Sequence, residues 1–169
     1  MKSILLPFWG ICTLQRGPQH VPTHPLFMAL LIATNLLVST FLNLHFDETG
    51  NVLGVFSFLV INLTIAAGII WIALYQKKIT NRFPQTLSAM VGCDLILTLL
   101  VAIVTLFTGG PKEQLTQGVI VLIAIWSVSV LGYILHHALN ITVIQGTFFA
   151  VAIVVVSTIF GGALTAPSS

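Results

Sequence analysis

Asp94 is the one acidic or basic residue inside a long apolar run of this sequence, Thr86 to Phe107. If the run is a helix that crosses a membrane from Thr86, Asp94 lies about 12 Å along it, at 1.5 Å per residue. A carboxylate at that depth is costly and marks a candidate site for a proton or an ion. A protonated Asp94 would instead donate one hydrogen bond and hold helices together. The residue type leaves both roles open.

Three further polar residues fall in the same half of the predicted membrane as Asp94: His136, His137 and Gln145. Histidine titrates near neutral pH, so an aspartate–histidine couple could bind or relay a proton. At 3.6 residues per turn, at most one of two consecutive histidines faces Asp94. The alternative is that both histidines lie at the headgroup level and hydrogen-bond to solvent. Together with Asp94, these residues form the candidate intramembrane polar site.

Other chemistry finds little support. His20 and His24 have a helical metal-ligand spacing, but three prolines between residues 18 and 25 exclude a helix there, and His45 lies across the membrane. Cys12 and Cys93 make no metal motif, and we expect them to be reduced thiols. We therefore predict no metal site and no cofactor. The chain also has no phosphate-binding loop, activated nucleophile or paired carboxylates, so we predict that it is not an enzyme.

The composition indicates which solvent surrounds these residues. Of the 169 residues, 57% are apolar and 6% are charged, whereas soluble domains carry roughly a quarter charged residues. So short a chain cannot bury that much apolar surface in one water-soluble core. The net charge of +2 is too small to indicate a nucleic-acid partner. Most of the chain must therefore lie in a lipid bilayer.

Five apolar segments have the roughly 20 residues that a membrane crossing needs. Because backbone groups in lipid require internal partners, we predict helices and an all-α, polytopic bundle over residues 25–163. Residues 164–169 form a short tail. The link between the last two segments is so short that they form either a tight hairpin or one broken helix. The five segments are Pro25–Leu44, Val52–Tyr75, Thr86–Phe107, Gly118–Leu139 and Ile141–Ala163.

Asn35 and Asn62 fall near the middle of the first two segments, which a short turn makes antiparallel neighbours. We predict that the two amides hydrogen-bond across this pair, a contact of about 0.6–2 kcal/mol in a membrane. Lining a small pore is the alternative role.

Residues 1–24 precede the bundle. Apolar residues at helical spacing between Lys2 and Arg16, with Trp9 as an anchor, predict a helix in the plane of the membrane interface, retained rather than cleaved. The proline-rich stretch that follows is an extended connector.

Five of the six basic residues lie on one side of the predicted membrane, with Lys112 alone on the other. This asymmetry places the N-terminus in the cytoplasm and the C-terminus outside. The absence of soluble domains is typical of a bacterial inner membrane protein. The basic loop with Lys77, Lys78 and Arg82 would contact anionic headgroups or a cytoplasmic partner.

Five closely spaced spans after an N-terminal segment with Gly17-Pro18 resemble the Yip (Ypt-interacting protein) family and its bacterial relatives. Leu14, Gln15 and Arg16 stand where that family has acidic and aromatic residues. The resemblance implies a non-enzymatic membrane protein that acts through partners.

The sequence thus predicts a multi-span membrane protein that acts by lateral association, as an assembly or scaffold subunit with a protein partner or as a homo-oligomer. The alternative is a small oligomeric transporter or channel subunit that uses Asp94 with His136 or His137 to bind a proton or cation.

Overall fold

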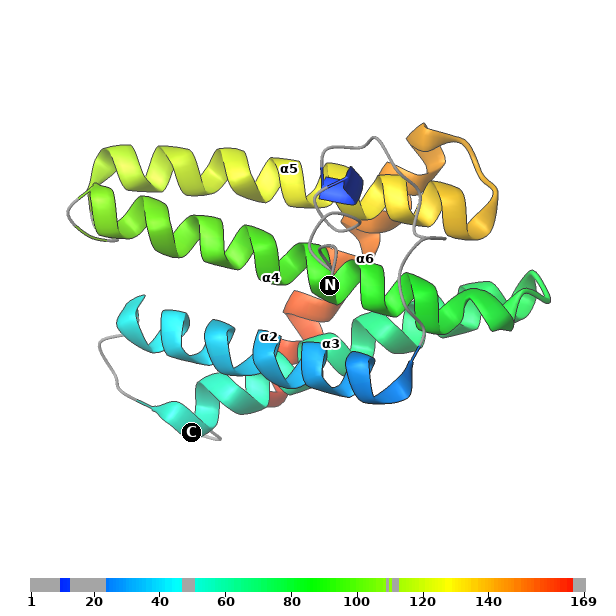
Figure 1. The fold of residues 1–169 in the computed structure, drawn as a ribbon, viewed down its shortest axis with the longest axis horizontal. Coiled ribbons are helices and arrows are strands. Elements are labelled where there is room, and N and C mark those ends of the chain that lie inside the picture. The colour runs from blue at the N-terminus through cyan, green and yellow to red at the C-terminus, as the bar shows by residue number, and fades with distance from the viewer. Residues whose placement is uncertain (1–9, 13–23, 47–50, 109, 111–112, 166–169) are drawn as a thin grey trace.

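The computed structural model describes residues 10–12, 24–46, 51–108, 110 and 113–165, without the side chains of residues 45, 46 and 165. Five long helices fill this part of the chain (Figure 1), and each is long and apolar enough to cross a membrane. The predicted all-α membrane bundle is therefore confirmed, with helix ends shifted by a few residues. The elements are α2 (Pro25–Phe46), α3 (Val52–Gln76), the 3-10 turn η2 (Thr80–Arg82), α4 (Phe83–Phe107), α5 (Gln114–Leu139) and α6 (Val143–Thr165).

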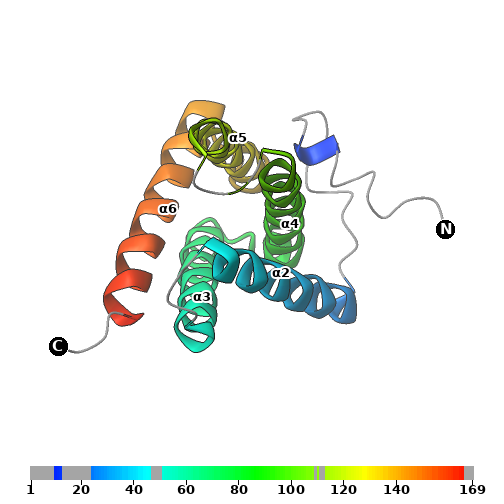
Figure 2. The ribbon, with the colours of Figure 1, turned by 90° about the vertical axis from the view of Figure 1, so that its left-hand side faces the viewer.

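The five helices form a closed ring that does not follow their order in the chain. α2 packs against α3 and α4, α4 against α5, α5 against α6, and α6 returns to α3. Seen end on, α6 spans the gap between α5 and α3 and completes the ring (Figure 2). This closure allows one central space to be bordered by all five helices.

One end of the ring carries a group of basic side chains. The α3–α4 link, with Lys77, Lys78 and Arg82, and the α5–α6 link at residues 140–142 lie at one end, which we call the basic end (Figure 1). The last turns of α2 and α4 and the first turns of α3 and α5 lie at the other end, which we call the distal end. In the basic link, Lys78 adopts a positive φ of 58° and η2 leads directly into α4, where Pro84 stands in the first turn.

The α5–α6 link settles the alternative that its length left open. Asn140 ends α5 in the left-handed conformation, with φ of 50°, which asparagine tolerates better than most residues. Thr142 then begins α6 through a reciprocal capping pair: the Gln145 N–H donates to Thr142 Oγ1 at 3.3 Å, and the Thr142 N–H donates to Gln145 Oε1 at 3.2 Å. The last two spans are therefore separate helices in a tight hairpin.

Within that hairpin, α5 and α6 approach closely at two glycines. A Cβ atom on Gly132 would lie 2.7 Å from the Cα of Thr147, and one on Gly146 would overlap the carbonyl oxygen of Gly132. Neither position has room for a side chain. Small residues at such a crossing let two helix backbones meet, as is typical of helix pairs in membranes.

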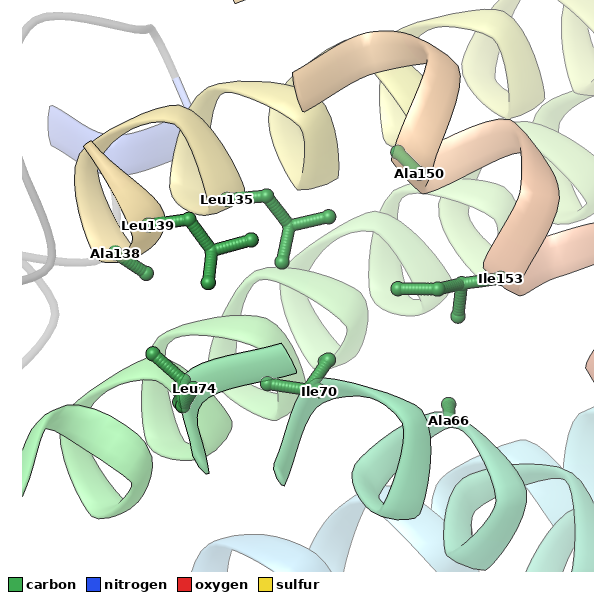
Figure 3. Packing of buried hydrophobic residues seen from close by; sticks show 8 residues of the cluster. All are labelled: Ala66, Ile70, Leu74, Leu135, Ala138, Leu139, Ala150 and Ile153. Atoms are coloured by element: carbon green, nitrogen blue, oxygen red, sulfur yellow. The ribbon is translucent and has the colours of Figure 1, made fainter. Parts of the chain in front are cut away.

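Close to the basic end, an apolar cluster fills the space between α3, α5 and α6. Figure 3 shows its side chains converging from the three helices. Tight apolar packing of this kind leaves little room for water between these three helices. The cluster consists of Ala66, Ile70, Leu74, Leu135, Ala138, Leu139, Ala150 and Ile153.

The described part of the N-terminal region lies elsewhere than predicted. Of the predicted interfacial helix, only residues 10–12 are described, and Trp9 lies outside them. Ile11 and Cys12 are buried against Cys93 of α4 and Val130 of α5, well inside the membrane-crossing part of both helices. The position in the interface plane is therefore wrong for these residues. Backbone at that depth is tolerated where protein covers it, and the Trp126 Nε1–H donates to the Cys12 carbonyl at 2.9 Å.

Candidate functional site

A cavity of about 180 Å³ lies inside the ring, and side chains from all five helices line it. Most of its wall is apolar, as is usual for ligand sites, with a few polar groups that converge on the space. The polar side chains are Asn35, Ser39, Asn62, Asp94, Ser127 and Ser157.

Asp94 is the charged group of this cavity and lies near the middle of α4. Its Oδ2 atom accepts a hydrogen bond from the Asn35 Nδ2 amide of α2 at 2.9 Å. Asn35 also donates to the Val91 carbonyl at 3.4 Å and is itself buried, so its amide is held in place. The Asp94 side chain, in contrast, is exposed although it lies in the interior of the ring, because it faces open space instead of packed atoms.

The carboxylate of Asp94 has a neutral partner. Helices α2 to α6 contain no lysine or arginine, and the hydrogen bond from Asn35 supplies a dipole without a countercharge. A carboxylate in a low-dielectric interior is stable only when a cation, a proton or water compensates it. A proton, a cation or water in the cavity would each compensate the Asp94 carboxylate in this way.

Two other polar side chains of the cavity have no hydrogen-bond partner among the described residues. The Ser39 hydroxyl and the Asn62 amide make no hydrogen bond to another described residue, whereas Ser127 and Ser157 donate to the Ala124 and Val154 carbonyls of their own helices. Buried polar groups are rarely left unpaired. At a liquid volume of about 30 Å³ per molecule, the cavity has room for about six waters, or for a hydrated ligand.

A second, more open hollow of about 410 Å³ borders Asp94 on the side of the distal end. Leu42 and Asn43 of α2 and Thr98 and Val101 of α4 line it, and all four lie toward the ends of their helices that face the distal end. Because Asp94 borders both spaces, it stands between the central cavity and the distal side. The apolar cluster lies on the other side of the cavity.

The structure separates His136 and His137 from Asp94. His136 Nδ1 pairs with the Ile141 carbonyl, and the His137 carbonyl accepts from Arg82 Nη1 at 3.3 Å. Both rings also contact Tyr133, and neither lines the cavity. The predicted coupling was wrong because of depth: His136 lies about 5 Å from the end of α5, whereas Asp94 lies about 16 Å from the start of α4.

Two other predicted roles are corrected. Gln145 is exposed at the basic end and caps α6, so it belongs to the hairpin and not to the site. Asn35 donates to Asp94 instead of to Asn62, although both asparagines border the same cavity. Lys77 and Lys78 are exposed at the basic end, where headgroup contact was predicted.

The sequence reasoning missed the hydroxyl residues of the wall. Polar residues recur every four positions on α2, at Asn35, Ser39 and Asn43, and on α4, at Asp94 and Thr98. This spacing places them on one face of each helix. A search for polar stripes inside apolar helices would therefore have identified these faces of α2 and α4. For a metal, no three His, Cys, Asp or Glu side chains gather within the described ranges; His20 and the side chain of His45 lie outside those ranges.

Comparison of the chain with family models, with curated proteins and with solved structures finds no match. The geometry around Asp94 therefore carries the functional argument by itself.

Proposed function

We propose that this protein is a small transporter or channel subunit that binds a proton or a small monovalent cation at Asp94. The observation that carries the proposal is the Asp94 side chain, which is open to the cavity inside a closed ring of helices and is paired with one neutral amide. An ionisable residue at this depth that faces a cavity is typical of ion and proton pathways.

The oxygen atoms that line the cavity favour a monovalent cation over a divalent one. One carboxylate and several neutral oxygens, from Ser39, Asn62 and Ser157, border the cavity. A monovalent ion would be neutralised by Asp94, whereas a divalent ion would leave an uncompensated charge in a low-dielectric interior. Oxygen ligands suit hard cations, and the cavity volume suits an ion that retains part of its hydration shell.

The hollow beside Asp94 supports access from the distal end in this conformation. At the basic end, the apolar cluster around Ile70, Leu74 and Leu135 closes the ring. Transport would then require α3, α5 and α6 to separate at that cluster, as rigid elements do when they rearrange about a fixed site. With the proposed orientation, the basic end faces the cytoplasm.

Binding at Asp94 is tested with the lipid-soluble reagent dicyclohexylcarbodiimide, which attacks protonated carboxyl groups in apolar surroundings. We expect an adduct on Asp94 in membrane vesicles, and we expect the yield to fall when Na⁺ or K⁺ is added or the pH is raised, because an ion or deprotonation removes the reactive acid. Mass spectrometry of peptides locates and quantifies the adduct.

Glu113, exposed at the start of α5, is the internal control and should remain unmodified. Labelling of Asp94 that neither cations nor pH alters would contradict the proposed binding. Absence of any adduct on Asp94 at low pH would show that the side chain is not open to the cavity.

Access from the distal end is tested by cysteine labelling in a chain whose native cysteines are replaced by serine. Thr98→Cys, in the hollow, should react with a membrane-impermeant thiosulfonate added on the distal side. Thr105→Cys should not, because Thr105 is buried and donates to the Val101 carbonyl of its own helix. The control lies nearer the distal end than Thr98, so labelling of Thr105→Cys alone would mean that depth, not the hollow, governs access.

The prediction of an assembly or scaffold subunit, which the Yip-type resemblance also implies, stays a prediction, and Gly17 and Pro18 lie outside the described residues. Purification in mild detergent at native abundance distinguishes the two proposals. A foreign protein recovered in stoichiometric amount would support assembly. Recovery of this chain alone, as a defined homo-oligomer with cation-sensitive Asp94, would support transport.

A further inference from the structure

Cys12 and Cys93 form a thiol pair, although 81 residues separate them in the sequence. The two side chains lie within hydrogen-bonding reach of each other, with 5% and 1% of their surfaces exposed. Ala89, Val130 and Ile134 complete the buried cluster around them. These are the two cysteines of the chain, and both are present as thiols.

Several contacts hold Cys12 beside Cys93. Ile11 is fully buried in the same cluster, and the hydrogen bond from Trp126 Nε1 to the Cys12 carbonyl holds the adjacent backbone against α5. Cys93 is fixed by its position in the middle of α4. Packing alone would have been satisfied by alanine or valine at either position, since a buried free cysteine behaves as a small apolar side chain.

The structure assigns Cys12 and Cys93 as the site of an intramolecular disulfide that fastens the N-terminal segment to α4. Both S–H bonds break, one S–S bond forms, and two electrons and two protons pass to the oxidant. The oxidant is a membrane-permeant two-electron acceptor, because protein and lipid surround both sulfur atoms. Disulfide geometry demands close and well-directed side chains, and the packed cluster provides this closeness before oxidation.

The disulfide would join the N-terminal segment to the helix of the candidate site. Cys93 precedes Asp94 and lines the same cavity, whereas residues 10–12 lie outside the ring beside α4 (Figure 2). Oxidation would therefore tie the segment before the bundle to the helix that carries the proposed binding site. This inference rests on the thiol pair and does not depend on what Asp94 binds.

The experiment oxidises the protein in membrane vesicles with diamide, which accepts the two electrons and two protons and becomes the corresponding hydrazine. The protein is then denatured in the presence of N-ethylmaleimide, so that every free thiol is blocked, and is reduced, and the released thiols are labelled with a polyethylene-glycol maleimide. We expect a monomer that carries two polymer chains. A monomer without polymer, or oxidation that yields only covalent dimers, would overturn the assignment.

Three variants serve as controls. Cys12→Ser and Cys93→Ser each leave one thiol, so neither should give a doubly labelled monomer. Trp126→Phe keeps an aromatic ring but removes the donor to Cys12. We expect disulfide formation in Trp126→Phe to slow about fivefold, since one hydrogen bond is lost. An unchanged rate of disulfide formation would show that the hydrogen bond from Trp126 does not hold the two cysteines together.

Discussion

Replacing Asp94 by asparagine is expected to abolish cation or proton movement through the protein while leaving its fold and abundance intact. Asparagine has nearly the same shape, and its side-chain oxygen can still accept the hydrogen bond that Asn35 now donates to Asp94. It carries no charge at any pH, so it gives a cation no countercharge and a proton no binding site. Loss of transport without loss of structure is the result specific to a working carboxylate.

The measurement is flux in liposomes that contain purified protein and a trapped pH-sensitive or Na⁺-sensitive dye. Wild-type protein should dissipate an imposed gradient, and Asp94→Asn should behave like empty liposomes. Ser127→Ala is the matched control, because Ser127 lines the same cavity but donates to its own helix, and it should retain flux. If Asp94→Asn fails to accumulate in the membrane, the aspartate holds the helices together and the proposed function is contradicted.

Gly146→Ala is expected to destabilise the fold by forcing α5 and α6 apart. The new Cβ atom would overlap the Gly132 carbonyl oxygen and approach the backbone nitrogen of His136 at 3.1 Å. Backbone atoms cannot rotate away as a side chain can, so α5 and α6 must move apart. Overpacking of this kind costs about 1–3 kcal/mol, and the α5–α6 hairpin borders both the cavity and the apolar cluster.

Gly68→Ala is the matched control for this prediction. Gly68 lies inside α3, and a Cβ atom added there would meet no neighbouring atom within 4 Å. Because alanine favours a helix over glycine by about 1 kcal/mol, this variant should be unchanged or slightly more stable. Unfolding in detergent, followed by the loss of helical circular dichroism on heating, compares the two. Equal unfolding midpoints would mean that the two helices are not held at the distance described.

The number and type of the helices could be predicted because lipid leaves few choices. A run such as Val52–Gln76 is apolar over 25 residues, and backbone groups in a bilayer must be paired within the segment. The order of the ring could not be predicted, because the helices are mostly apolar and the short polar stripes on α2 and α4 do not show which helices are neighbours. The contacts at Gly132 and Gly146 depend on that order.

Two residues of the candidate site could be predicted from the sequence, but their pairing could not. Asp94 stands out by charge alone, and Asn35 stands out as an amide at mid-depth. Their pairing depends on α2 packing against α4, which adjacency in the chain does not indicate, since α3 lies between them. His136 and His137 were selected because they lie in the same half of the membrane as Asp94, but about 12 Å of depth separates His136 from Asp94.

The order of helices around the ring has a consequence for biosynthesis. The ribosome releases α2, α3, α4 and α5 before α6, yet α6 is the helix that joins α3 to α5. Until α6 inserts, the ring has a gap, and the polar interior with Asp94 opens toward lipid. The nascent chain therefore carries an exposed ionisable group in the bilayer until α6 has inserted. A chain truncated before Val143 should be recognised by membrane chaperones and degraded, even though it contains both Asn35 and Asp94.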